Sequence, residues 1–268
     1  MITSLNIGRR GNLCNSMFQL AAVIGMAKKT GFDIAIPHNK TYYEPSYGRN
    51  NTSIFDGFDI TIPILDRNNL AFTDIEFPFH YEEQHVDDFT NMIGFFQSEK
   101  YFVEAKTEVA SQFQFKKSVK DILSNKLDNK YYPDPDICTA LHIRLGDYVH
   151  LRDSHPAQPG SYWQQAVKRA GFKKIIIFSD DIKTAKQIFG ESANVIYSTD
   201  NDPFVVLYHM SLCRNNIICN STFGWWGAWL GEQNNKHEKI VIAPKLWFGP
   251  GHRSLDPKDI IPNRWLTI

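Results

Sequence analysis

Three clusters of polar side chains follow short apolar runs in the second half of the sequence. They are His142, Arg144 and Asp147; Ser179, Asp180 and Asp181; and Asn220, Ser221 and Thr222. An arginine can grip a phosphate with two parallel hydrogen bonds, and a carboxylate can accept hydrogen bonds from a ribose or a purine edge. A helix that begins at the third cluster would add free N–H groups, which bind anions. The side-chain types therefore indicate a site for a nucleotide or another phosphorylated ligand.

Each cluster also has a purely structural interpretation. Arg144 and Asp147 could form an ion pair at the end of a strand, beside a satisfied histidine. Either Asp180 or Asp181 could cap the helix that follows. A metal-binding acid pair is a third interpretation, and the sequence DPD at 134–136 has the Asp-x-Asp form, although it lies in a proline-rich linker. The residue types alone leave these alternatives open.

Three of the six tryptophans follow the third cluster. Trp225, Trp226 and Trp229 lie in a segment with helical character, and their spacing of three and four places them on one side of that helix. This spacing predicts core packing for the tryptophans. Contact with a phosphate is predicted for Ser221 and Thr222, which stand at the start of the helix.

Strands and helices alternate through the second half of the chain, which predicts a parallel, doubly wound α/β sheet. The predicted strands are 137–145, 173–181, 194–199, 215–222 and 239–244, and the predicted helices are 160–172, 182–190, 202–214 and 223–232. Ligands bind such sheets outside the carboxyl ends of the strands. The three polar clusters lie at three of these ends, so they are expected to converge on one edge of the sheet.

The first half opens with a predicted strand, turn, helix and second strand. Their ranges are 2–7, 8–15, 16–31 and 33–37, and a helix over 103–129 and a linker over 130–136 are predicted further on. The turn and the start of the helix carry the segment GNLCNSMFQ. It has neither the dinucleotide fingerprint nor the P-loop pattern. Asn15 within it is predicted to be a helix cap or a ligand contact.

Composition narrows the class of protein. The 268 residues include 29 basic and 29 acidic side chains, so no net charge points to nucleic acid or a membrane surface as partner. No apolar run approaches the about 20 residues that span a bilayer, and the N-terminus lacks the pattern of a signal peptide. A cytoplasmic protein without a transmembrane segment is therefore expected. The four cysteines form no CxxC pair, which argues against a zinc site or a disulfide framework.

Seven segments, taken in order, carry a resemblance to a known family. They are GNLCNSMFQ, GFFQSEKYF, HIRLGDYV, FSDDI, NSTFGWWGAWL, IAPKLWF and the closing DIIPNRWLTI. The sequence resembles the α-1,2-fucosyltransferases of glycosyltransferase family 11 over nearly its whole length. The resemblance implies an α/β fold of the GT-B type, with two Rossmann-like domains facing across a cleft. Residues 1–132 would form the acceptor-side domain and residues 133–268 the domain that binds the GDP-sugar donor.

The resemblance also implies roles for individual residues. Arg144 would hold the β-phosphate of GDP, and His142 and Asp180 would contact the guanosine. The segment Asn220, Ser221, Thr222 and Phe223 would bind the donor, with Ser221, Thr222 and Phe223 at its phosphates. Asn15 would reach the donor phosphate or the fucose from the N-terminal domain. Asp147 is a candidate base for the acceptor hydroxyl, although it could instead orient Arg144.

The activity implied by the resemblance is transfer of fucose from GDP-fucose to a glycan hydroxyl, expected to be O2 of a galactoside. The family inverts the anomeric configuration and needs no metal ion and no further cofactor. Cys14 and Ser16 depart from the family pattern, which usually has glycine and glutamine there. They lie in the segment that would face the fucose and the acceptor. Transfer of another GDP-sugar, and a non-catalytic protein that binds a nucleotide-sugar or a glycan, therefore remain alternatives.

Overall fold

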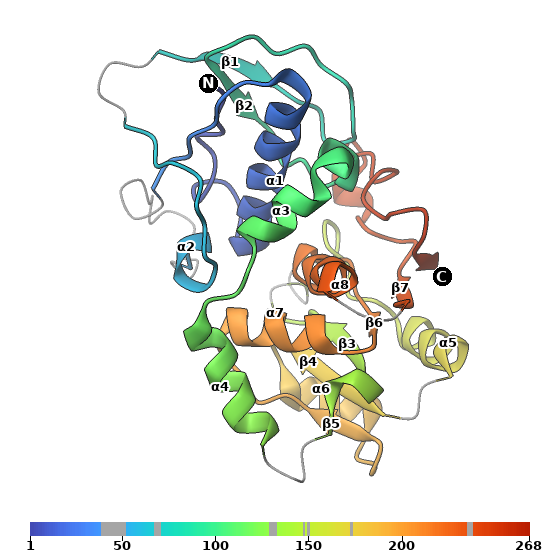
Figure 1. Ribbon diagram of the computed structural model, residues 1–268. Helices are drawn as coiled ribbons and strands as arrows, with labels where there is room; N and C mark the ends of the chain where they lie inside the picture. Colours follow the sequence, from blue (N-terminus) through green and yellow to red (C-terminus); the bar gives the residue numbers. More distant parts are fainter. Residues whose placement is uncertain are drawn as a thin grey trace. The chain divides into compact units, whose positions relative to one another are not determined.

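The computed structural model describes residues 1–38, 52–66, 71–128, 133–146, 148, 151–171, 174–234 and 238–268. The chain forms two compact units (Figure 1). Unit 1 comprises Met1–Lys116 and Asp256–Pro262, and unit 2 comprises Lys117–Leu255 and Asn263–Ile268.

Unit 1 is built on a parallel β layer and one long helix. Strand β1 (Thr73–Glu76) pairs in parallel with β2 (Thr90–Ile93). The two predicted N-terminal strands are present only as isolated parallel bridges, which join Ile2 to Ile34, Thr3 to Asn91 and Ile36 to Ile64. The bridges extend the layer beyond β2, so the predicted β-turn-α-β opening is confirmed in topology although its strands are short.

Helix α1 (Leu13–Thr30) follows the first bridged segment and begins three residues earlier than the sequence predicts. It ends where the sequence predicts, because Gly31 adopts a φ of 76° and donates its N–H to the carbonyl of Ala27. Midway along α1, a Cβ on Gly25 would lie 2.0 Å from the carbonyl oxygen of Tyr101. Glycine therefore lets the helix backbone pack directly on the short 3-10 turns η3 (Glu99–Tyr101) and η4 (Val103–Ala105).

The helix predicted over 103–129 is wrong as a single element. The structure has α3 (Lys106–Gln112) and α4 (Lys117–Leu127), separated by a short extended segment. Phe115 in this segment forms an antiparallel bridge with Phe58, which follows the short helix α2 (Ile54–Gly57). The rings of Phe113 and Phe115 lie 5.2 and 4.9 Å from the ring of Phe58. Burial of these rings in unit 1 interrupts the helix.

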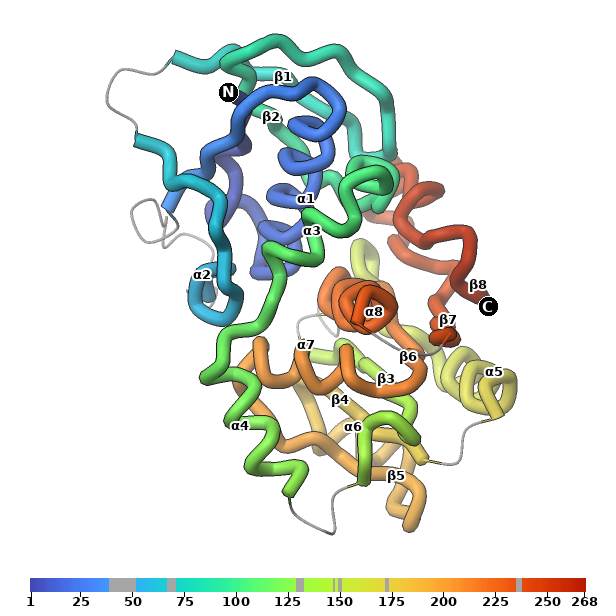
Figure 2. The backbone as a smooth tube through the Cα atoms, in the orientation of Figure 1, coloured from blue at the N-terminus to red at the C-terminus, as the bar shows by residue number. Residues whose placement is uncertain are grey.

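Unit 2 contains a six-stranded parallel sheet in the order β5-β4-β3-β6-β7-β8. The strands are β3 (Thr139–Ile143), β4 (Ile175–Ser179), β5 (Val195–Tyr197), β6 (Asn215–Ile217), β7 (Val241–Ala243) and β8 (Leu266–Thr267). The backbone trace shows β8 beside β7 near the C-terminus (Figure 2). The predicted parallel sheet is confirmed, with the C-terminal β8 as an additional edge strand.

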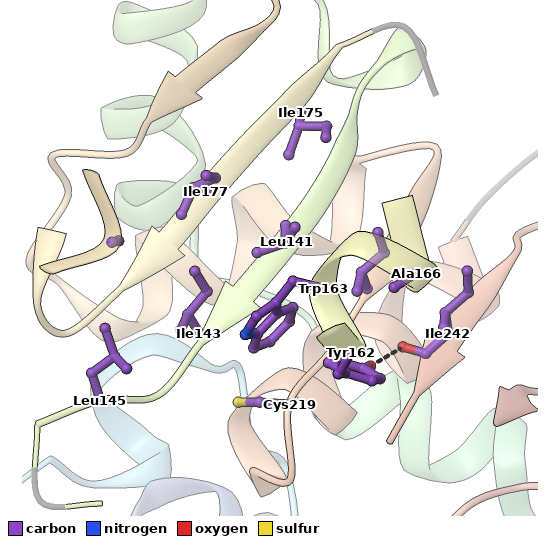
Figure 3. Packing of buried hydrophobic residues seen from close by; sticks show 12 residues of the cluster. Leu141, Ile143, Leu145, Tyr162, Trp163, Ala166, Ile175, Ile177, Cys219 and Ile242 are labelled. Atoms are coloured by element: carbon purple, nitrogen blue, oxygen red, sulfur yellow. Dashed lines mark hydrogen bonds between the residues drawn. The ribbon is translucent and has the colours of Figure 1, made fainter. Parts of the chain in front are cut away.

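Helices cover both faces of this sheet, as expected for a doubly wound fold. They are α5 (Gly160–Ala170), α6 (Ile182–Phe189), α7 (Pro203–Leu212) and α8 (Thr222–Asn234), with the 3-10 turns η5 (Pro135–Ile137) and η7 (Pro250–His252). One face packs Leu141 and Ile177 against Trp163 of α5 (Figure 3). The other face packs Ala140 and Phe178 against residues that include Met210 of α7. Successive residues of a strand therefore point into two separate cores, one on each face of the sheet.

Unit 2 begins at Lys117, whereas the sequence places the start of the second domain at residue 133. The boundary differs because α4 belongs to unit 2, where it packs against α7 and buries Val119 and Leu123. Lys126 of α4 also forms an ion pair with Asp200, with 2.9 Å between Nζ and Oδ1. Near the C-terminus, residues 256–262 belong to unit 1, where Asp259 accepts a hydrogen bond from the backbone N–H of Tyr81.

No helix among the described residues is both long enough and apolar enough to cross a membrane.

Candidate functional site

The predicted convergence of the three clusters is confirmed for their described residues. Strand β3 pairs with β4 on one side and β6 on the other, in a register that sets Ile143 opposite Ser179. Just beyond these strands, Asp180 accepts hydrogen bonds from the backbone N–H groups of Leu145 (2.8 Å) and Gly146 (3.1 Å). The carboxyl ends of β3, β4 and β6 thus form one edge with an arginine, a histidine and a helix start.

Arg144 forms an ion pair with Asp180, with 3.1 Å between Nε and Oδ2. Its guanidinium carbon also lies 5.9 Å from the centroid of the Tyr148 ring. The Arg144 side chain is 32% exposed, so solvent and ligands can reach it. The sequence suggested Asp147 as the partner for Arg144, but Asp147 lies outside the described residues. A Cβ on Gly146 would lie 2.6 Å from Asp180 Oδ2, which explains the glycine in this loop.

The two aspartates after β4 have different environments. Asp181 is the N-cap of α6 and accepts hydrogen bonds from the backbone N–H (3.0 Å) and hydroxyl (2.6 Å) of Thr184. These bonds lower the pKa of Asp181 below its usual value. The predicted cap is therefore confirmed for one of the two acids. Asp180 instead holds the loop after β3 and the Nε of Arg144, so its described contacts are with protein groups that shape the site.

His142 is buried near the end of β3, and its ring lies 5.4 Å from that of Phe223. Its Nδ1 lies 3.4 Å from the sulfur of Cys219. Burial lowers the pKa of His142 to about 4; the charge of Asp180 opposes this shift and that of Arg144 adds to it. The imidazole is therefore neutral at physiological pH.

The Asn220 side chain is fully engaged by protein groups. Its Nδ2 donates to the carbonyls of Trp247 (2.9 Å) and Pro156 (3.1 Å), and its Oδ1 accepts from Gln158 (2.9 Å). The hydroxyl of Tyr148 donates to its backbone carbonyl at 2.9 Å. The Asn220 side chain thus joins the loop that contains Pro156 and Gln158 to the loop that contains Trp247. The sequence analysis missed Gln158 and Trp247, because no local pattern marks a partner more than 25 residues away.

The third cluster forms the start of α8. Ser221 Oγ accepts the backbone N–H of Phe223 at 3.3 Å, and the Ser221 carbonyl accepts that of Trp225 at 3.1 Å. Thr222 is the first residue of the helix. The three tryptophans are completely buried, which confirms their predicted packing role: Trp225, Trp226 and Trp229. The hydroxyl residues thus stand at the positive end of the helix dipole.

Asn15 belongs to unit 1, whereas the other described site residues belong to unit 2. It lies in the first turn of α1, and its Oδ1 accepts a hydrogen bond from Gln97 at 2.8 Å. It is not the N-cap of α1, which is Asn12. A Cβ on Gly11, where φ is +89°, would lie 2.2 Å from Asn15 Nδ2. The departure at Ser16 has a structural role, since its hydroxyl accepts the N–H of Gly8 at 3.0 Å.

Within the described residues, no group of three His, Cys, Asp or Glu side chains is placed to hold a metal ion.

The fold defines an α/β protein whose unit 2 is a doubly wound parallel sheet. The family model for glycosyl transferase family 11 matches residues 2–267, and the chain therefore belongs to that family. A relative named O-antigen biosynthesis glycosyltransferase WbnK, from Escherichia coli, is 38% identical over 43% of this chain and 41% of its own length. An alpha-1,2-colitosyltransferase from the same organism is 33% identical over 66% of this chain and 61% of its own length. The chain thus matches only part of each relative.

A more distant relative is a galactoside alpha-(1,2)-fucosyltransferase of Bos taurus, 23% identical over 84% of this chain and 65% of its own length. Among solved structures, POFUT1 in complex with GDP-fucose matches with a TM-score of 0.54 and 10% identity, over 90% of this chain and 96% of that chain. The alpha-1,6-fucosyltransferase NodZ, soaked with GDP-fucose, gives a TM-score of 0.52 and 15% identity, over 85% and 91%. These structures confirm the predicted GT-B fold.

The buried histidine predicts a pH dependence of stability. Because the pKa of His142 is near 4 in the folded chain and near 6.5 in the unfolded chain, the unfolded chain binds more protons between these values. The free energy of unfolding should therefore fall as the pH drops, and this histidine should account for about 2 kcal/mol between pH 7 and 5. Urea unfolding of the wild type and His142→Gln at both pH values measures this share. An equal pH dependence in the two proteins would contradict the assignment.

Proposed function

We propose that this protein is an inverting glycosyltransferase that transfers fucose from GDP-fucose to a glycan hydroxyl, with O2 of a galactoside as the expected acceptor position. One observation carries the proposal. Arg144, held by Asp180, stands at the same sheet edge as the start of α8. An arginine fork and a helix N-terminus together are suited to a diphosphate.

The chemistry places negative charge on the departing diphosphate. The acceptor oxygen forms a bond to the anomeric carbon of the sugar, the bond from that carbon to the β-phosphate oxygen breaks, and GDP leaves. Attack on the face opposite the leaving group converts a β-linked donor into an α-linked product. Arg144 and the first N–H groups of α8 stabilise the charge on the leaving oxygen. This arrangement supports transfer without a metal ion and without a cofactor beyond the donor.

The remaining roles follow from the family resemblance. His142 and Asp180 contact the guanosine, and Ser221, Thr222 and Phe223 meet the phosphates. For Asn220 we propose an indirect role through the loops that it joins, since its amide is engaged by three protein groups. Asn15 contributes from unit 1, and Asp147 is the proposed base that takes the proton of the acceptor hydroxyl. A cytoplasmic location also stays a prediction.

A second candidate donor is GDP-colitose. The E. coli relative that is 33% identical is named for colitosyl transfer with an α-1,2 link. Colitose is the 3-deoxy analogue of fucose, so the same diphosphate site would serve both donors. The discrimination would depend on groups near the sugar ring rather than on Arg144.

A donor and acceptor panel tests the proposal. Full-length protein is incubated with GDP-fucose, GDP-colitose or GDP-mannose and a set of galactosides, in EDTA or in Mg²⁺. We expect free GDP and an α-1,2-linked fucosyl product at equal rates in both buffers. Product only from GDP-colitose or GDP-mannose would change the donor, and a strict need for Mg²⁺ would contradict the metal-independent mechanism. Binding of GDP-fucose without turnover on any acceptor would support a non-catalytic binding protein.

A further inference from the structure

The thiol of Cys219 contacts the buried histidine of the site. Cys219 follows β6 by two residues and is 2% exposed, and its sulfur lies 3.4 Å from His142 Nδ1. Figure 3 shows Cys219 at the end of the core cluster that also contains Leu141 and Ile143 of β3. The contact joins β3, which carries His142 and is followed directly by Arg144, to the segment that leads into α8.

The direction of this hydrogen bond follows from the states of its two partners. Burial raises the pKa of Cys219 to about 12, so the sulfur carries a proton, and the backbone N–H of Arg144 already interacts with its acceptor side. His142 is neutral at physiological pH and therefore carries one ring proton. A thiol that donates to Nδ1 leaves this proton on Nε2.

Close packing around the ring leaves little space beside Nδ1. A Cβ on Gly224 would lie 2.8 Å from Nδ1 and 3.1 Å from Cβ of Ile218, so only glycine leaves room beside this nitrogen. Phe223 packs against the ring with a tilt of 33°. Within the described part of the chain, no protein hydrogen bond engages Nε2 of His142.

We propose that Cys219 is a positioning residue that holds His142 in the Nε2–H tautomer, so that the ring offers a hydrogen-bond donor to an acceptor atom of the GDP portion of the donor. The statement that GDP accepts a hydrogen bond from Nε2 rests on the function proposed above, whereas the assignment of the tautomer does not. Phosphate oxygens and the O6 and N7 atoms of guanine are all acceptors. In the opposite tautomer Nε2 would carry a lone pair, which would repel these acceptor atoms.

Nitrogen-15 NMR of histidine-labelled protein reads the tautomer directly in the absence of any ligand. His142→Gln identifies the resonances of His142 among the nine histidines. We expect Nε2 to be protonated and Nδ1 to be an unprotonated acceptor in the wild type. In Cys219→Ala the Nδ1 signal should shift as its hydrogen bond is lost. Protonation of Nδ1 in the wild type, or an unchanged Nδ1 signal in Cys219→Ala, would overturn the inference.

Calorimetric titration with GDP then tests the consequence for binding. Cys219→Ala should weaken GDP binding by about five- to tenfold, the usual scale for one hydrogen bond. Cys219→Ser restores a donor and should bind within about twofold of the wild type. Cys138→Ala is the matched control, since Cys138 is a buried thiol of unit 2 in the core on the other face of the sheet.

Equal weakening in Cys219→Ala and Cys138→Ala would indicate general loss of packing and would overturn the positioning role. If the wild type binds no GDP, the proposed function and the GDP part of the inference both fail. The NMR spectrum still decides the tautomer in that case.

Discussion

Arg144→Ala is expected to lower the rate of sugar transfer by about 10³-fold and to weaken GDP binding at the same time. The Arg144 guanidinium lies at the ends of β3 and β4, where its Nε is 3.1 Å from Asp180 Oδ2. In the proposed site, its loss would remove the main counter-charge of the departing diphosphate and would leave Asp180 to repel the phosphates. Initial rates of GDP release and GDP titration by calorimetry measure the two effects.

Two further variants sharpen this result. Arg144→Lys keeps the charge but loses the planar fork, so it should fall between the wild type and Arg144→Ala. Arg169→Ala removes an exposed arginine from the last turn of α5 and should leave both measurements unchanged. Thermal unfolding checks that every variant is folded. Wild-type turnover in folded Arg144→Ala would show that the site lies elsewhere.

Asn220→Asp is expected to destabilise the protein by about 3–5 kcal/mol, the scale of an unpaired buried charge. The substitution keeps the size of the side chain but replaces a donor of two hydrogen bonds with a carboxylate oxygen. That oxygen would face the carbonyls of Pro156 and Trp247, 3.1 and 2.9 Å from the present nitrogen. Urea unfolding at pH 7 measures the loss, and GDP binding should fall as the loops beside the site separate.

Asn216→Asp is a matched control within the same unit. Asn216 is also completely buried and donates to the carbonyl of Met210 at 3.2 Å, but its Oδ1 accepts from Lys239 Nζ at 2.8 Å. A carboxylate there gains an ion pair, so the cost should be well below that of Asn220→Asp. Equal costs at the two positions would contradict the role assigned to the carbonyls around Asn220.

The strand-end position of the site could be predicted from the sequence because the chemistry follows the apolar runs directly. Once β3, β4 and β6 are recognised as parallel neighbours, His142, Asp180 and Ser221 must lie near one edge. The choice between Asp180 and Asp181 could not be predicted. Both acids follow the same strand, and only the turn after β4 directs one to Thr184 and the other to Arg144.

Long-range contacts explain most of what the sequence analysis missed. Nothing local indicates that Phe115 pairs with Phe58, yet this bridge divides the predicted helix over 103–129. The amide of Asn220 resembled a ligand contact by its position in the third cluster, but its partners come from loops more than 25 residues away. The N-terminal strands are shorter than the sequence predicts. Their residues pair with neighbouring segments of unit 1 only through isolated bridges.

The central claim is that the donor binds at the carboxyl ends of β3, β4 and β6 in unit 2. Amide hydrogen exchange of the full-length protein, with and without GDP-fucose, tests it most directly. We predict slower exchange in peptides that cover 142–146 and 221–224, and loss of this protection in Arg144→Ala. Unchanged exchange in both peptides at a saturating donor concentration, with protection elsewhere in the chain, would contradict the account.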